Sequence, residues 1–302
     1  MSQAQRISLE DALTEFIDDL RAANRTDNTI GFYLDKLRPF FTWLRETHAV
    51  ATPGAITVPI LRAYFIHLKH GHTDGGVDAY WRAISAFLRF LERVEEIDAS
   101  PLRKLRRPKI DKPLLAPATL EDLRKLTKTC TGPAIHDKRD MAIIHILLDT
   151  GVRASELCAL NVGDVNLDSG EVAIRKTKSR QARTVFISPV TRRHVRAYLR
   201  KRSGARPDEP LILTVRSPLH RLAYDGLRAV IDDRSERARI APPLLHAFRR
   251  CFAITCWRNG MDILTIARLM GHGSLTVLMR YIAAETGDLA TSHDKHGPTH
   301  NF

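Results

Sequence analysis

A proline-rich basic segment, SPLRKLRRPKIDKP at residues 100–113, separates the chain into two parts. Each proline lacks a backbone N–H and clashes with the preceding turn, so the three prolines here block a continuous helix. We therefore predict an extended, stiff connector between two folded domains. A chain of 302 residues is long enough to bury two cores. The predicted organisation is a domain at 1–99, the linker at 100–113, a second domain at 114–285 and a polar tail at 286–302.

The first predicted domain is helical throughout. Apolar residues recur with helical spacing in four runs, which begin near Ser8, Asn28, Thr57 and Val77. Ser8 begins a helix-capping pattern, and Pro39 is expected to bend or split the second helix. No strand pattern interrupts these runs, so the sequence predicts a compact four-helix unit.

The second predicted domain changes its hydrophobic period. Helical spacing at 119–128 and 139–149 gives way to alternation with a period of two between Asp164 and Ile187, and helical spacing returns from Ser188 onward. The alternation predicts a small antiparallel sheet whose last hairpin carries several basic side chains. The predicted fold class is mainly α with a small antiparallel β-sheet, in a helical domain followed by a mixed α/β domain.

The excess of basic residues favours a polyanionic partner. Lys and Arg number 47 against 34 Asp and Glu, which gives a formal charge of +13. Nucleic acid is the first partner to consider, although a merely soluble basic protein has the same composition. The basic connector is well placed to follow a phosphate backbone, and the alternative is a solvated linker that contacts nothing. The predicted DNA-binding residues of the linker are Arg103, Lys104, Arg106, Arg107 and Lys109.

Cysteine usage and the N-terminal sequence indicate a cytoplasmic protein. The four cysteines lie in apolar helical context and form no CxxC pair, so we predict reduced core residues. The N-terminus has no basic-then-apolar signal pattern, and no apolar run approaches the roughly 20 residues needed to cross a bilayer. Secretion and membrane insertion are therefore disfavoured.

Scattered polar residues in the second part are the candidates for chemistry. Arg153 follows the Thr150-Gly151 break and lies near apolar residues, where an arginine needs an anion or a carboxylate, and Glu156 is a candidate for that carboxylate. His246 and Arg249 are three residues apart and therefore share a helix face. Each of these signals is weak by itself.

Residues 264–282, LTIARLMGHGSLTVLMRYI, contain an apolar helical run, a glycine turn and a second short helix that carries Tyr281. In isolation Tyr281 is an ordinary core aromatic. Its hydroxyl is a candidate nucleophile only if residues elsewhere in the chain bind a substrate group that it can attack.

Five motifs occur in the order typical of the tyrosine recombinase, or phage integrase, family. They are TGVRASEL, the hairpin TKSRQART, the helix HAFRR, and LMGH followed nine residues later by Tyr281. The N-terminal helices resemble the SAM-like core-binding domain of the same family. The chain as a whole resembles an Xer-like site-specific recombinase, which implies a two-domain fold with a C-terminal catalytic domain.

The resemblance implies a role for each matching residue. Arg153 and Arg249 would grip the scissile phosphate, a task that suits a guanidinium fork because it donates paired hydrogen bonds and stays charged. Tyr281 would attack the phosphorus, and Lys178 would protonate the leaving 5′ oxygen, with Lys176 as an open alternative. The remaining implied roles are hydrogen bonding and proton transfer by His246, hydrogen bonding to the phosphate by His272, support of the arginine by Glu156, and DNA binding by Lys176 and Arg180.

The implied activity is cleavage and rejoining of duplex DNA through a 3′-phosphotyrosine intermediate. The sequence has no Asp/Glu cluster of the two-metal kind and no GxxxxGK[ST] loop, so we expect no metal, ATP or other cofactor. The implied partners are double-stranded DNA with inverted half-sites and further copies of the chain, as a tetramer on two DNA sites. An accessory DNA-bending protein or a partner recombinase stays open.

Two alternatives to site-specific recombination are kept. A type IB topoisomerase uses similar tyrosine chemistry to relax DNA, and a DNA-binding protein can retain the fold without the chemistry. The sequence does not reveal the target site, or whether the biological event is integration, excision, transposition or dimer resolution.

Overall fold

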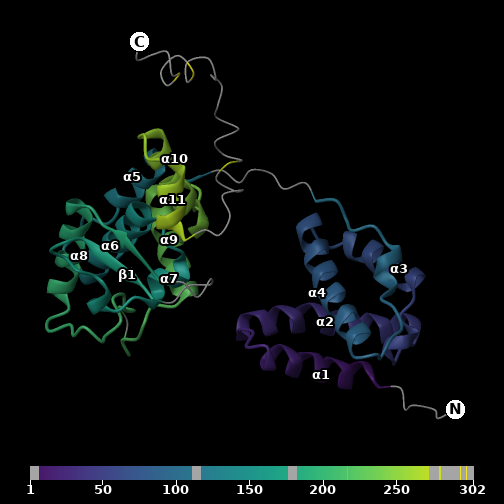
Figure 1. Cartoon of the computed structure of the whole chain (residues 1–302). Coiled ribbons are helices and arrows are strands. Elements are labelled where there is room, and N and C mark those ends of the chain that lie inside the picture. The colour runs from purple at the N-terminus through teal and green to yellow at the C-terminus, as the bar shows by residue number, and fades with distance from the viewer. Residues whose placement is uncertain are drawn as a thin grey trace. The chain divides into compact units, whose positions relative to one another are not determined.

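The computed structural model describes residues 7–110, 117–175, 182–215 and 217–271, together with the single residues 279, 293 and 297. The chain forms two compact units, Met1–Pro113 and Leu114–Phe302. Each unit has its own buried apolar core. Figure 1 labels α1 to α11 and β1.

The described part of the first unit is entirely helical, as predicted. Ser8, Thr26 and Thr73 are N-caps whose hydroxyls accept hydrogen bonds from backbone N–H groups of the first helical turn, which explains where three of the helices begin. Leu37 and Phe87 are fully buried between the helices. The elements are α1 (Leu9–Ala22), α2 (Asp27–His48), the 3-10 helix η1 (Pro53–Ala55), α3 (Val58–Lys69), α4 (Asp74–Arg93) and the 3-10 helix η2 (Pro101–Lys104).

Two features of this unit concern Pro39, predicted to bend or split its helix, and the linker, predicted to be extended. Pro39 lies inside α2 without splitting it, because the buried Leu37, Phe40 and Phe41 hold the helix in the core on both sides of the proline. The segment predicted to be an extended connector begins as η2, and its Leu102 is buried in the core of the first unit. Proline is compatible with the first position of a helix, so Pro101 does not prevent this turn.

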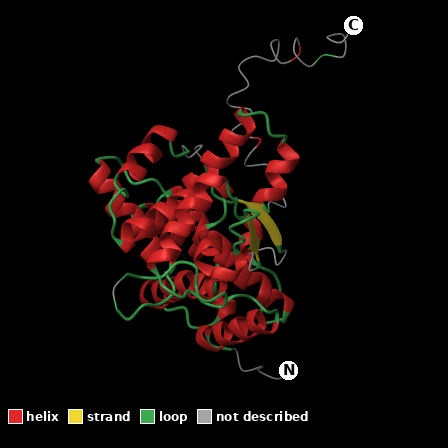
Figure 2. Ribbon diagram, turned by 90° about the vertical axis from the view of Figure 1, so that its left-hand side faces the viewer, coloured by secondary structure: helices red, strands yellow, loops and turns green. Residues whose placement is uncertain are grey.

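The described part of the second unit is mainly helical with one small sheet, which confirms the predicted fold class (Figure 2). Thr119, Ser188 and Asp262 are the N-caps of three of its helices, and their side chains accept hydrogen bonds from the first helical turn. The elements are α5 (Leu120–Lys128), α6 (Ile135–Thr150), α7 (Ala154–Ala159), the 3-10 helix η3 (Val162–Asp164), β1 (Glu171–Ile174), β2 (Arg183–Phe186), α8 (Pro189–Lys201), α9 (Tyr224–Ala238), α10 (Leu245–Arg258) and α11 (Ile263–Met270).

The described sheet consists of β1 and β2 paired antiparallel, with Glu171 opposite Phe186 and Ile174 opposite Arg183. The predicted strand around Val165 is reduced to a single bridge between Val165 and Val172. The tip of the hairpin, residues 176–181, lies outside the described residues.

Helix α6 lies in the core of the second unit and packs against both α8 and α10. Ile143 and Ile144 are fully buried there. A buried ion-pair network also ties α9 to α6, since Arg234 donates to Asp137 Oδ1 at 2.9 Å and to Asp140 Oδ2 at 2.7 Å. The mutual attraction and hydrogen bonds of these buried charges offset their desolvation penalty and connect α9 to α6.

The four cysteines are free thiols, and Cys130 and Cys251 are buried as predicted. Cys158 and Cys256 are only partly buried. Among the described residues, no helix is both long and apolar enough to span a membrane.

Candidate active site

A glycine turn at the end of α6 positions the first candidate arginine. Gly151 has a φ of +59°, and a Cβ at this position would lie 2.4 Å from Cδ1 of Phe252. Only glycine therefore fits the turn. Two residues later Arg153 is the N-cap of α7, in extended backbone conformation.

Glu156 is the carboxylate that Arg153 contacts. Its Oε2 accepts a hydrogen bond from the backbone N–H of Arg153 at 2.9 Å, and its Oε1 accepts one from Nη1 of the same residue at 2.8 Å. Burial by itself would raise the pKa of Glu156, but the hydrogen bonds from Arg183 and Arg153 outweigh it and lower the pKa to about 2. Glu156 is therefore ionised at neutral pH, and it holds both the backbone and the guanidinium of Arg153.

Arg249 is the most buried of the candidate cations. Its Nη1 donates to the carbonyl of Gly151 at 2.6 Å, and its Nη2 donates to the carbonyl of Met270. These carbonyls belong to the C-terminal ends of α6 and α11, where the helix dipole favours a positive charge. The side chain lies in α10, so one guanidinium joins three helices.

The remaining nitrogen of the Arg249 guanidinium, the buried Nε, has no hydrogen-bond partner among the described residues. Burial, followed by the charge of Arg153, lowers the pKa of Arg249 to about 9. The guanidinium is still charged at neutral pH, and an incoming anion would relieve the repulsion between the two arginines.

His246 lies one turn before Arg249 in α10, with part of its side chain exposed to solvent and part covered by the protein. Desolvation of its ring, followed by the positive charges of Arg249, Arg250 and Arg153, lowers its pKa below the usual value. The imidazole is therefore neutral at pH 7, with one ring nitrogen able to accept a proton.

Arg183 was not among the predicted site residues, yet it belongs to the same cluster. Its Nη1 and Nη2 donate to the two carboxylate oxygens of Glu156 at 3.0 and 2.7 Å. One signal for it was present in the sequence: Arg183 has the same strand parity as Val185 and Ile187, both of which are buried. A charged residue on the inward face of a strand needs a buried partner.

The structure thus brings Arg153, Glu156, His246 and Arg249 into one region of the second unit, through the contacts given above. The other predicted residues, Lys176, Lys178, Arg180, His272 and Tyr281, lie outside the described residues. Gly271, which precedes His272 in the chain, is described and caps the end of α11.

Comparison with known proteins identifies the fold and the family. A sequence model of the phage integrase family matches residues 118–287, more than half of the chain. The chain belongs to this family. It is therefore a tyrosine-type recombinase with a function in DNA recombination, as predicted from its motifs.

Named relatives and solved structures agree with this assignment. The recombinase is 28% identical over 276 residues to the tyrosine recombinase XerA of Pyrococcus furiosus, covering 90% of this chain and 88% of that protein. The lambda integrase dimer bound to a COC′ core site shares its fold with a TM-score of 0.73 at 15% identity, over 94% of this chain and 79% of the other. A lambda integrase tetramer bound to a Holliday junction gives a TM-score of 0.70 at 15% identity, over 89% and 78% of the two chains.

The basic linker of the recombinase divides into two kinds of residue. Arg107 makes a bidentate pair with the buried Asp78 of α4, at 2.8 and 3.1 Å, and Arg103 pairs with Glu92 at 2.5 Å. These two arginines help to fasten the segment to the first unit. Lys104, Arg106 and Lys109 are exposed and make no ion pair with any described residue, so their charge is free for a polyanion.

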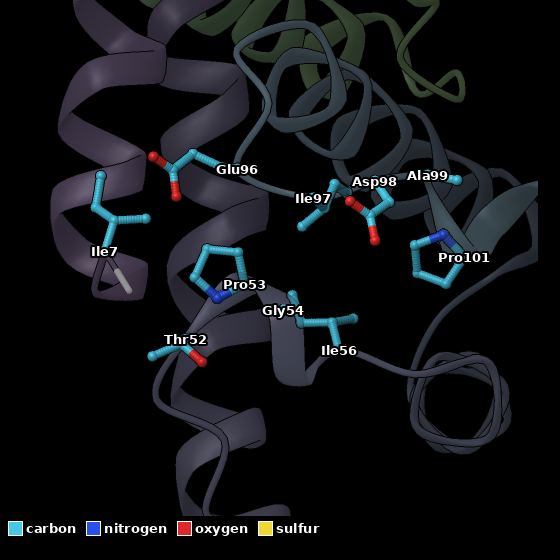
Figure 3. A pocket seen from close by; sticks show the side chains of 10 residues that line it. All are labelled: Ile7, Thr52, Pro53, Gly54, Ile56, Glu96, Ile97, Asp98, Ala99 and Pro101. Atoms are coloured by element: carbon cyan, nitrogen blue, oxygen red, sulfur yellow. The ribbon is translucent and has the colours of Figure 1, made fainter. Parts of the chain in front are cut away.

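A pocket in the first unit has the wrong charge for a phosphate. It lies between the start of the unit, η1 and the segment after α4, and its lining includes the carboxylates of Glu96 and Asp98 (Figure 3). Two carboxylates repel a phosphate, so this pocket is not a candidate DNA contact.

Proposed function

We propose that this recombinase cleaves and rejoins duplex DNA at specific sites through a transient 3′-phosphotyrosine bond to Tyr281. The observation that carries the proposal is the buried guanidinium of Arg249, which keeps an unpartnered Nε beside the charge of Arg153. A buried donor without a partner is costly unless a ligand completes it. A non-bridging phosphate oxygen is an acceptor of the right charge.

Two arginines suit this reaction because of where charge develops. In phosphoryl transfer the negative charge spreads over the equatorial oxygens, so fixed donors aimed at them lower the barrier. Arg249 is held by two helix ends and Arg153 by Glu156, so neither has to reorganise during the reaction. In the proposed site these side chains neutralise the phosphate, and the reaction needs neither a metal ion nor a nucleotide.

The proposed cleavage step conserves protons and bonds. The phenol oxygen of Tyr281 forms a bond to phosphorus as the bond from phosphorus to the 5′ oxygen breaks. A neutral His246 accepts the phenol proton, and Lys178 donates a proton to the leaving 5′ oxygen. His272 completes the donors around the phosphate. The reverse reaction with the 5′ hydroxyl of another strand rejoins the DNA.

The proposed partners are duplex DNA with inverted half-sites and three further copies of the chain. A homologous fold in lambda integrase is found as a tetramer on a Holliday junction, which supports an assembly of four subunits on two DNA sites. Lys104, Arg106 and Lys109 would contact the phosphate backbone, together with Lys176 and Arg180 of the hairpin. The proposed cleavage step assigns no role to an accessory DNA-bending protein or a second recombinase, because every proposed reacting group belongs to one chain.

The test is covalent trapping on DNA. The wild-type chain is incubated with fragments of the genome that surrounds its gene, and adducts that survive SDS are recovered and their attached ends sequenced. We expect the wild type to yield adducts at a recurring sequence, with protein on the 3′ phosphate, and Tyr281→Phe to bind the same fragment without forming an adduct. An adduct that persists in Tyr281→Phe would overturn the assignment of the nucleophile.

A further inference from the structure

Arg183 is a charged side chain buried in the second unit. It lies at the start of β2, opposite the buried Ile174 in the ladder, and its side chain is only 9% exposed. An arginine at this depth is retained only if its charge and donors are matched by partners.

Every nitrogen of the Arg183 guanidinium donates to a protein oxygen. Nη1 and Nη2 bind the two oxygens of Glu156, and Nε donates to the carbonyl of Leu269 at 2.7 Å. Arg249 differs in this respect, because its Nε has no partner among the described residues. Arg183 is therefore engaged with the protein, whereas Arg249 keeps a donor for a ligand.

Glu156, the first partner of Arg183, also binds Arg153, which is one of the two arginines proposed to contact the phosphate. Glu156 receives hydrogen bonds from Arg183 and, on the same two oxygens, from the backbone and guanidinium of Arg153. One carboxylate thus sets the direction of two arginines. Because the Arg183 fork is planar and bidentate, it fixes the plane of the carboxylate in a way that a single charge cannot.

The second partner of Arg183 is the end of α11. The carbonyl of Leu269 accepts from Arg183, and the carbonyl of the next residue, Met270, accepts from Arg249. Gly271 has a φ of +62°, and a Cβ there would lie 3.0 Å from both Cδ and Nη1 of Arg183. The C-terminal turn of α11 is therefore bound by the guanidinium groups of Arg183 and Arg249.

We propose that Arg183 is a positioning residue for DNA cleavage, which connects Arg153 to the chain segment that carries His272 and Tyr281. Its guanidinium fixes Glu156, and through it Arg153, relative to the C-terminal end of α11. The proposal rests on the cleavage function proposed above. Arg183 acts through its neighbours and does not itself contact the DNA.

The test compares adduct formation with DNA binding in matched variants. The probe is the genomic fragment recovered from wild-type adducts, and binding is measured in a Tyr281→Phe background so that cleavage does not interfere. We expect Arg183→Gln to slow single-turnover adduct formation at least about tenfold while the Kd for the fragment changes less than about threefold. Arg175→Gln is the control, since Arg175 lies in the same hairpin and its pair with Asp164 is exposed on the arginine side.

A double-variant cycle separates positioning from a general structural effect. If Arg183 acts through Glu156, the variant Arg183→Gln/Glu156→Gln will be no slower than the slower single variant, because both changes remove the same contact. Loss of Arg183 also removes two of the hydrogen bonds that keep the pKa of Glu156 low, so the acid limb of the rate profile will move to higher pH in Arg183→Gln. The proposal would be overturned if the rate losses of the two single variants multiplied in the double variant and the pH dependence of the Arg183→Gln rate matched that of the wild type.

Arg183→Lys keeps the experiment informative if Arg183→Gln does not fold. A single ammonium cannot hold both carboxylate oxygens and the Leu269 carbonyl, so we expect a folded variant with an intermediate adduct rate. A rate within about twofold of the wild type in either folded variant would overturn the positioning role while leaving the proposed function intact. A wild-type chain that forms no adduct on any genomic fragment would overturn both.

Discussion

The guanidinium of Arg249 is charged although both its burial and a neighbouring positive charge disfavour the charged form. It is almost fully buried, and it lies close enough to Arg153 for that charge to lower its pKa. The carbonyls of Gly151 and Met270 compensate part of the burial cost, and the buried Nε is a donor without a partner among the described residues. The Arg249 guanidinium is therefore suited to binding an anionic ligand.

A lysine at this position would lose that arrangement. Arg249→Lys keeps a charge but cannot donate to two helix ends and to a phosphate in one plane. We expect adduct formation on the recovered DNA fragment to fall about 100-fold or more, which corresponds to about 2.7 kcal/mol of transition-state stabilisation. Single-turnover assays measure this change, and Arg258→Lys, an exposed arginine at the end of the same helix, is the control. Equal rates for the wild type and Arg249→Lys would remove Arg249 from the site.

At the scale of elements, the site depends on where three helices end or begin. α6 ends at Gly151, α7 begins after Arg153, and α11 ends at Gly271. Each glycine has a positive φ, and each is pressed against a side chain of the site or its support, Phe252 and Arg183 respectively. The position of both arginines therefore follows from turns that need glycine.

Gly151→Ala tests the first of these turns. The new Cβ would meet the Phe252 ring at 2.4 Å in a backbone region that alanine disfavours, so we expect a loss of about 2–4 kcal/mol in the free energy of unfolding. Gly260→Ala is the matched control: its φ is +89°, but the space around it is open, and it should cost only about 1 kcal/mol. Urea denaturation compares the two variants. Equal losses would show that the contact with Phe252 is unimportant.

At the scale of the molecule, the second unit holds groups whose protonation changes with folding. The ring of His145 in α6 lies against that of His194 in α8, with ring centroids 4.3 Å apart. Burial, followed by the charge of His194, lowers the pKa of His145 to about 4, although nearby Asp149 acts in the opposite direction. Burial and the charges of Arg193 and Lys138 also lower the pKa of His194. Both histidines are therefore neutral in the folded chain at pH 7.

This arrangement predicts acid destabilisation before the carboxylates titrate. Because the folded pKa of His145 is lower than the unfolded value of 6.5, the unfolded chain binds the proton first as the pH falls. The contribution to stability is complete above pH 6.5 and is lost progressively between about pH 6.5 and 4, by at most about 3 kcal/mol. Unfolding free energies measured across this range should fall less steeply in His145→Gln. Parallel curves for the two chains would contradict the prediction.

The sequence by itself determined what depends on neighbours along the chain. The cap at Ser8, the helical class of the first unit and the pair of Arg153 with Glu156 all involve residues within about one helical turn, so local spacing predicts them. The ordered motifs also determined the family, because their residue types and order survive without coordinates.

Only the tertiary structure decided which distant groups meet. Arg183 and Glu156 are separated by 27 residues, and Arg249 and Gly151 by 98, so no periodicity in the sequence relates them. The same holds for Arg107 and Asp78, which are 29 residues apart and pair across the first unit. Such pairs form because a buried charge must find a partner wherever packing brings one, and packing is a property of the whole unit.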